Sequence, residues 1–240
     1  MKNYALIFAG GTGQRMNAKS LPKQFLCVHG KPIIVHTLLQ FENSKDINGI
    51  VVVCLESYID KLKSMLSEYG IKKVLDIVKG GASGQQSIYN GLTRLSECAK
   101  ENDIVLIHDG VRPLIDGKLI ADNIACVKKN GNAITVSKAI ETVVLVENDN
   151  VSAIENREKC FYAKAPQSFY FTDIFACHNK ALSENKHEFI DSATMMQYYG
   201  HKLHTVLCDS ENIKITTQPD YFMFKGLLDS KELSQMKVKL

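Results

Sequence analysis

Short apolar runs alternate with segments of helical periodicity along most of this chain. Runs such as Val51-Val52-Val53-Cys54 are apolar throughout, which is typical of strands buried on both faces of a parallel sheet. The predicted strands are 4–9, 49–55, 74–78, 103–108, 133–137, 167–171, 202–207 and 212–216. The predicted helices are 32–42, 58–69, 85–100, 116–130, 172–183 (capped by Thr172), 192–199 and 221–230. This alternation predicts an α/β fold with a mostly parallel sheet covered by helices on both faces.

The pattern changes between residues 138 and 160. Two short alternating segments, 142–147 and 151–155, flank the turn Asn148-Asp149-Asn150, and this arrangement predicts a β-hairpin. The hairpin is either a surface ribbon or an arm that reaches a partner subunit. Otherwise residues 1–240 are predicted to form a single domain, with a frayed tail at 231–240.

Composition and charge narrow the class of protein only slightly. The 240 residues are 45% hydrophobic, enough for one full-sized core, and the net charge of +3 suits a phosphorylated substrate but is too small to indicate nucleic-acid binding. The seven cysteines are spaced singly, as expected for free thiols in a reducing compartment. No apolar run reaches the ~20 residues of a membrane span, and the N-terminal run is too short for a signal peptide. We therefore expect a soluble cytoplasmic protein without a membrane partner.

A glycine-rich loop, Gly10-Gly11-Thr12-Gly13, follows the first predicted strand. Glycines let backbone N–H groups approach phosphate oxygens, and Arg15 and Lys23 add positive charge. The dinucleotide fingerprint fails because its third glycine is replaced by Met16. A Walker loop fails because no Gly-Lys-Ser/Thr follows. The loop therefore predicts a triphosphate cradle, with a tight turn and solvated side chains as the alternative.

A second candidate site, His108-Asp109-Gly110, ends a buried strand. Ligands of such sheets bind at the carboxyl ends of the strands, and Gly80-Gly81 ends a third strand there. Asp109 is predicted to be a Mg²⁺ ligand, although Asp at a strand end is often a cap or turn residue. Arg112 is predicted to pair with Asp109 or to shape its loop, and His108 to be structural.

Six ordered blocks carry a resemblance that spans nearly the whole chain. They are Ala-Gly-Gly-x-Gly-x-Arg-Met, Pro-Lys-Gln-Phe, Gly-Gly-x₅-Ser-Ile, His-Asp-Gly-x-Arg-Pro, Ala-Pro-Gln-Ser-Phe and Asn-Ile-Lys-Ile-Thr. The sequence resembles the family of methylerythritol-phosphate and ribitol-5-phosphate cytidylyltransferases. The resemblance implies a three-layer Rossmann-like fold, a homodimer joined by the hairpin arm, and transfer of CMP from CTP to a polyol phosphate with Mg²⁺.

The resemblance also implies roles for individual residues. The cytidine would contact Ala9, Gly10, Gly81 and Ser87, and the triphosphate would contact Gly11, Thr12, Gly13, Arg15 and Lys23. Asp109 would hold Mg²⁺ close to the CTP ribose and the acceptor, and Lys214 would stabilise the α-phosphate. The acceptor would also contact Arg112, Asp191 and Arg157, the last reaching across from the neighbouring subunit.

Three positions depart from the family pattern and leave the acceptor open. Gly84 replaces an arginine, while Ala165 and Ile190 replace hydroxyl residues that would contact the acceptor. Five residues separate Met16 from Pro22, as in the ribitol-phosphate branch, which favours D-ribitol 5-phosphate and a role in cell-wall, capsule or lipopolysaccharide synthesis. The alternatives are 2-C-methyl-D-erythritol 4-phosphate, used in isoprenoid synthesis, and a non-catalytic nucleotide-binding relative.

Overall fold

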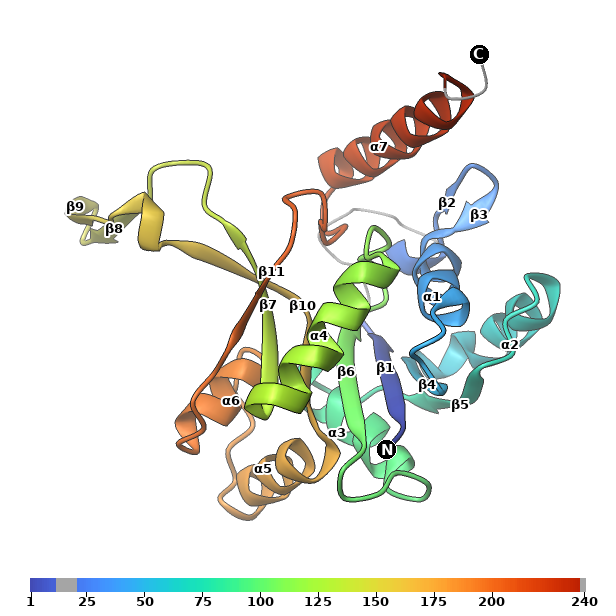
Figure 1. The fold of residues 1–240 in the computed structure, drawn as a ribbon, viewed down its shortest axis with the longest axis horizontal. Coiled ribbons are helices and arrows are strands. Elements are labelled where there is room, and N and C mark those ends of the chain that lie inside the picture. The colour runs from blue at the N-terminus through green and yellow to red at the C-terminus, as the bar shows by residue number, and fades with distance from the viewer. Residues whose placement is uncertain (12–20, 238–240) are drawn as a thin grey trace.

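A seven-stranded sheet forms the centre of the molecule (Figure 1). The computed structural model describes residues 1–11 and 21–237. The sheet order is β11-β7-β10-β6-β1-β4-β5. Its strands are β1 (Asn3–Ala9), β4 (Gly49–Cys54), β5 (Val74–Lys79), β6 (Ile104–Asp109), β7 (Asn132–Lys138), β10 (Phe161–Tyr170) and β11 (Thr205–Leu207). All pairings are parallel except those of β10, which runs antiparallel to β6 and β7.

Helices cover both faces of this sheet, as predicted. The main helices are α1 (Ile33–Asn43), α2 (Ile59–Glu68), α3 (Gly84–Leu95), α4 (Gly117–Asn130), α5 (Phe171–Ser183), α6 (Ser192–Tyr198) and α7 (Gln218–Lys237). Successive residues of β1 point to opposite faces: Ala5 and Ile7 join the core beneath α1, α2 and α4, whereas Tyr4 and Leu6 join the core beneath α3, α5 and α6. Two-sided burial explains why the strand lacks polar alternation. The predicted α/β class is confirmed.

The predicted hairpin is present and protrudes from the body of the molecule (Figure 1). Its strands are β8 (Val144–Glu147) and β9 (Asn150–Ile154), paired antiparallel, and the turn residues Asn148 and Asp149 have positive φ. Several large apolar side chains of the hairpin and its base are exposed in the single chain: Val144, Leu145, Val146, Val151, Ile154, Phe161 and Tyr162. Its role in dimerisation remains a prediction.

The predicted strand at 212–216 is wrong. This segment belongs to neither a helix nor a strand, although Ile215 N donates to Val111 O at 2.9 Å. Its apolar pattern has another origin, because Ile215 is fully buried in a small core with Val28, Ile33 and Phe224. The segment therefore joins the sheet edge to α7 and places Lys214 beside the strand ends.

Several boundary predictions are also wrong. Strand β10 begins at Phe161 and not at 167, and helix α3 ends at Leu95 and not at 100. Helix α5 begins at Phe171, and Thr172 does not cap it, because its hydroxyl donates to Glu101 O at 3.0 Å. Helix α7 runs through Lys237 where a frayed tail was expected from residue 231; residues 238–240 lie outside the described part. Among the described residues, no helix combines the length and apolar character that crossing a membrane requires.

Candidate active site

Three strand ends meet at one edge of the sheet, as the sequence predicted. In the register of β1 with β6, Phe8 pairs with Asp109, and Gly80 N donates to Cys54 O at 2.8 Å. A Cβ placed on Gly10 would lie 3.4 Å from Ser87 Oγ and 3.5 Å from Gly80 Cα. These are ordinary van der Waals distances, so the first loop lies directly against the loop before α3.

A cavity of about 610 Å³ opens over these strand ends. It is lined by the described residues to which a nucleotide role was assigned: Ala9, Gly10, Gly11, Lys23, Gly81, Ser87, Asp109 and Lys214. Thr12, Gly13 and Arg15 fall outside the described residues. Ser87 Oγ accepts a hydrogen bond from Gly81 N at 3.0 Å, which fixes the loop before α3.

Gln24 fixes the first loop from beneath, a role that the sequence did not single out. Its side chain is 1% exposed, and Nε2 donates to Ala9 O at 2.7 Å and to Gly11 O at 3.2 Å. With both carbonyls held by one amide, the loop backbone can present its N–H groups to the cavity. Gln24 belongs to the block Pro22-Lys23-Gln24-Phe25, which is the sequence feature that could have indicated its role.

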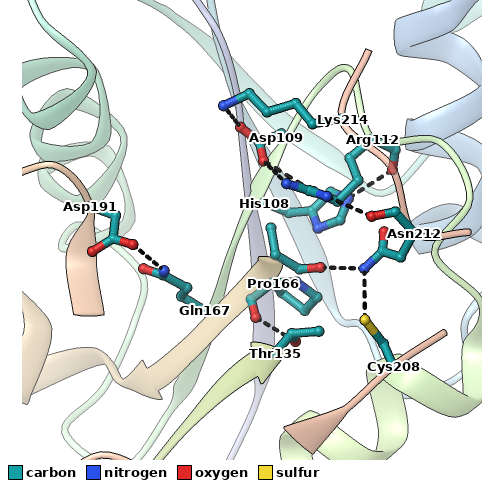
Figure 2. Close-up of polar contacts among 11 residues, drawn as sticks. His108, Asp109, Arg112, Thr135, Pro166, Gln167, Asp191, Cys208, Asn212 and Lys214 are labelled. Atoms are coloured by element: carbon teal, nitrogen blue, oxygen red, sulfur yellow. Dashed lines mark hydrogen bonds and ion pairs between the residues drawn. The ribbon is translucent and has the colours of Figure 1, made fainter. Parts of the chain in front are cut away.

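Asp109 is the electrostatic centre of the site (Figure 2). Its Oδ1 lies 2.6 Å from Lys214 Nζ, and its Oδ2 lies 3.2 Å from both Nε and Nη2 of Arg112. Burial would raise the pKa of Asp109, but the charges of Arg112 and Lys214 outweigh burial and hold the pKa below its usual value. The predicted pairing of Arg112 with Asp109 is confirmed.

Backbone contacts hold Arg112 and its loop (Figure 2). Arg112 Nη1 donates to Asn212 O at 2.6 Å, and Asn212 Nδ2 donates to Ala165 O at 2.8 Å. His108 is fully buried, its Nε2 lies 3.0 Å from Arg112 O, and burial lowers its pKa to about 4. The neutral ring donates a hydrogen bond to this carbonyl and so holds the loop in place. This agrees with the prediction that His108 is structural.

A second cavity, of about 380 Å³, adjoins the first. Both are lined by Phe8, Gly84, Asp109 and Lys214. Asp191 lines the second cavity and caps α6 by accepting from Thr194 N at 2.8 Å, and it also accepts from Gln167 Nε2 at 2.8 Å. The three departures from the family pattern, Gly84, Ala165 and Ile190, all line this cavity, so they change the walls of the second site and not of an unrelated surface.

Arg157 lines neither cavity of its own chain. It begins a short 3₁₀ turn next to the hairpin, where it is exposed and its Nη1 donates to Ile140 O at 3.4 Å. The structure therefore does not bring Arg157 to the site within one chain, and the predicted role across subunits is untested by it.

The side chains available as metal ligands can be compared with the expected Mg²⁺ site. Within the described part of the chain, no group of three or more His, Cys, Asp or Glu side chains could enclose a metal ion. The residues lining the nucleotide cavity include one carboxylate, Asp109. A single carboxylate fits Mg²⁺ in the common arrangement where substrate phosphates and water supply most ligands.

A nucleotide-sized cavity at the carboxyl ends of the strands, joined to a second cavity through an Asp–Lys pair, is the arrangement expected of a nucleotidyltransferase with a Rossmann-like fold. The chain belongs to the 2-C-methyl-D-erythritol 4-phosphate cytidylyltransferase family, whose family model matches residues 4–230. It is therefore a cytidylyltransferase.

Relatives refine this placement. The chain is 47% identical to the ribitol-5-phosphate cytidylyltransferase of Streptococcus agalactiae serotype V, over 98% of this chain and 99% of that relative. It is 36% identical to the 2-C-methyl-D-erythritol 4-phosphate cytidylyltransferase of Clostridium botulinum, over 95% and 98%. The crystal structure of 4-diphosphocytidyl-2C-methyl-D-erythritol synthase from Anaerococcus prevotii has a TM-score of 0.81 at 27% identity and covers 95% of this chain and 96% of that chain. The greater identity to the first relative confirms the predicted position near the ribitol-phosphate branch.

Proposed function

We propose that this protein transfers CMP from CTP to the phosphate of D-ribitol 5-phosphate, giving CDP-ribitol and pyrophosphate. The observation that carries the proposal is the pair of adjoining cavities that share Asp109 and Lys214, because the two substrates must meet at one phosphorus atom. The sequence identity of 47% to a ribitol-5-phosphate cytidylyltransferase supports ribitol 5-phosphate as the acceptor.

The reaction is an in-line displacement. An oxygen of the acceptor phosphate attacks the α-phosphorus of CTP from the second cavity, and pyrophosphate leaves on the side of the glycine-rich loop. Such a reaction needs positioning and charge neutralisation and no covalent enzyme intermediate. Lys214 is 41% exposed in its side chain, so its ammonium can leave Asp109 and bind the α-phosphate. Arg15 and Lys23 would neutralise the β- and γ-phosphates.

Asp109 would also hold Mg²⁺, which supplies positive charge to the phosphates when bound. Oδ1 is the suitable ligand, because Arg112 holds Oδ2 and the lysine that contacts Oδ1 is the more exposed partner. Arg112 then keeps the carboxylate ionised and oriented while Lys214 is engaged with substrate.

We further propose a cytoplasmic homodimer in which the hairpin arm delivers Arg157 to the acceptor of the neighbouring subunit. The exposed apolar side chains of the arm support this assembly, because a monomer would leave them in water. All seven cysteines are free thiols, which agrees with a reducing compartment.

Pyrophosphate release tests the proposed function directly. Purified protein is incubated with Mg²⁺ and CTP, UTP or ATP, together with ribitol 5-phosphate, 2-C-methyl-D-erythritol 4-phosphate or glycerol 3-phosphate. We expect the highest kcat/KM with CTP and ribitol 5-phosphate, and a CDP-ribitol mass in the product. A preference for methylerythritol phosphate would move the acceptor to the other branch, and no release with any pair by folded protein would overturn the proposed reaction.

A further inference from the structure

The second cavity, where the acceptor is proposed to bind, contains one cation without a carboxylate partner among the described residues. We call it the acceptor cavity. Its walls include Arg112, Lys164 and Lys214 as cations and Asp109 and Asp191 as carboxylates. Asp109 is held by Arg112 and Lys214, and Asp191 accepts hydrogen bonds from Gln167 and Thr194. Lys164 contacts neither carboxylate. With three cations and two carboxylates, the cavity lining therefore carries one positive charge in excess.

Lys164 stands on β10 directly before Ala165, half-buried. Burial lowers its pKa, the positive charge of Arg112 lowers it further, and the Cys208 thiol acts in the opposite direction. A half-buried ammonium is costly unless an anion or hydrogen-bond acceptor compensates for the lost water. The chain itself supplies no carboxylate here among the residues described, so an anionic ligand is the natural complement.

We propose that Lys164 binds the phosphate group of the acceptor and sets the affinity for phosphorylated polyols. This inference rests on the proposed function and extends it to a residue of this chain. In the same wall, Ala165 and Ile190 cannot offer the hydroxyl groups that the family resemblance places there. Lys164 offers this wall one charge-assisted contact, and the acceptor phosphate, a dianion at neutral pH, supplies the missing negative charge.

The test compares Lys164→Gln and Lys164→Arg with wild type, in full-length protein. Lys129→Gln is the matched control, because Lys129 is an exposed lysine of α4 that lines neither cavity. Initial rates of pyrophosphate release give separate KM values for CTP and ribitol 5-phosphate. A contact to a charged group predicts a rise of roughly 10-fold or more in the KM for ribitol 5-phosphate with Lys164→Gln. The KM for CTP should stay within roughly 2-fold, and Lys164→Arg should recover most of the loss.

A pH series from 7.5 to 10.5 adds a measurement that would not change if Lys164 were only structural. The series ends at the ordinary pKa of a lysine, and the pKa of Lys164 lies below that value. The acceptor phosphate stays fully ionised over this range, so loss of the Lys164 proton should raise the acceptor KM of wild type. Arginine does not deprotonate here, so Lys164→Arg should show a flatter rise. Arg112 and Cys208 act on the pKa of Lys164, and Asp109, Asp191 and Lys214 line the same cavity. All five groups are present in both proteins, so their own titration cancels in the comparison.

Three outcomes would overturn the role of Lys164: an unchanged acceptor KM in Lys164→Gln, equal rises in the KM for both substrates, or identical pH series for wild type and Lys164→Arg. Failure of the proposed function is distinguishable, because wild type itself would then release no pyrophosphate with any polyol phosphate.

Discussion

The ammonium of Lys214 lies 2.6 Å from Oδ1 of Asp109, and these two side chains stand where the two cavities meet. Their burial differs: the side chain of Asp109 is 7% exposed, and that of Lys214 is 41% exposed. The carboxylate is thus a fixed charge, also held by buried Arg112, while the lysine is free to change partners. Because of this difference in burial, we expect replacement of Asp109 to affect stability and activity, and replacement of Lys214 to affect activity alone.

Asp109→Asn should damage both folding and catalysis. The substitution leaves the buried Arg112 guanidinium without its carboxylate, and breaking a buried ion pair in this way typically costs about 3–5 kcal/mol. We expect urea unfolding to show a loss of this size and pyrophosphate release to fall at least ~100-fold. Asp122→Asn is the control: Asp122 pairs with Lys118 on the surface of α4, where such pairs add little. Near-wild-type stability of Asp109→Asn would contradict the importance of its pairing with Arg112.

Lys214→Met should separate activity from stability. Because Arg112 still neutralises Asp109, the midpoint of urea unfolding should barely change. The turnover number should fall by roughly 100-fold, since one donor to a developing charge is lost from the transition state. Lys231→Met, which removes an exposed lysine of α7 lying 4.0 Å from Glu211, should keep wild-type turnover. A Lys214→Met enzyme with unchanged kcat would exclude Lys214 from the reacting centre.

The sequence predicted the helix and sheet layers and the candidate site more fully than it predicted how neighbouring segments pack against them. Uniformly apolar strands depend on local patterns, so β1 and β6 were predicted close to their observed ends. The strand expected at 212–216 failed because its apolar alternation is equally satisfied by packing Ile215 against Phe224. Periodicity reports which side chains are buried, and it does not report what covers them.

In the candidate site, too, residues in local motifs were predicted and contacts between distant segments were not. The glycines and Asp109 could be assigned to one site because each follows a predicted strand, whereas Lys214 was assigned to it only through the family resemblance. No local pattern predicted the second cavity, since its walls come from β1, β6, β10, α3, α5, α6 and the segment before α7; only the family resemblance placed Arg112 and Asp191 at the acceptor. Gln24 was overlooked for a related reason: its two acceptors, Ala9 O and Gly11 O, are backbone atoms that no residue type reveals.

Gln24→Ala should weaken the nucleotide site mainly through the shape of the first loop, because Gln24 lies at the nucleotide cavity but is only 1% exposed and binds two carbonyls of that loop. The variant leaves two backbone carbonyls without their buried donor, and an unmade buried hydrogen bond costs about 1–3 kcal/mol. We expect a destabilisation in this range by urea unfolding and a KM for CTP raised roughly 5-fold to 50-fold, with the acceptor KM nearly unchanged. Gln197→Ala, at an exposed position of α6, serves as the control. An unaltered KM for CTP would show that the loop holds its shape without Gln24.

Protein stability should fall between pH 6.5 and pH 4.5 because of two buried histidines. Burial lowers the pKa of His108 and of His178 to about 4. Both stay neutral in the folded protein while the unfolded chain binds protons below about pH 6.5. Stability is therefore fully present above that pH and is lost as the pH falls toward 4. Each histidine contributes up to about 3 kcal/mol to this loss, an order-of-magnitude figure from the size of its shift.

His178→Phe tests this account at a single position. His178 is 1% exposed, and its Nε2 has no hydrogen-bond partner among residues 1–11 and 21–237. The ring stacks 6.1 Å from Tyr89, so phenylalanine can take its place without leaving a buried polar atom unpaired. We expect equal or slightly higher stability at pH 7.5 and roughly half of the wild-type loss at pH 4.5, measured by urea unfolding at each pH. The remaining loss belongs to His108, which keeps its bond to Arg112 O, together with His36, whose pKa burial also lowers. Parallel stability curves for the two proteins across this range would show that His178 does not titrate on unfolding.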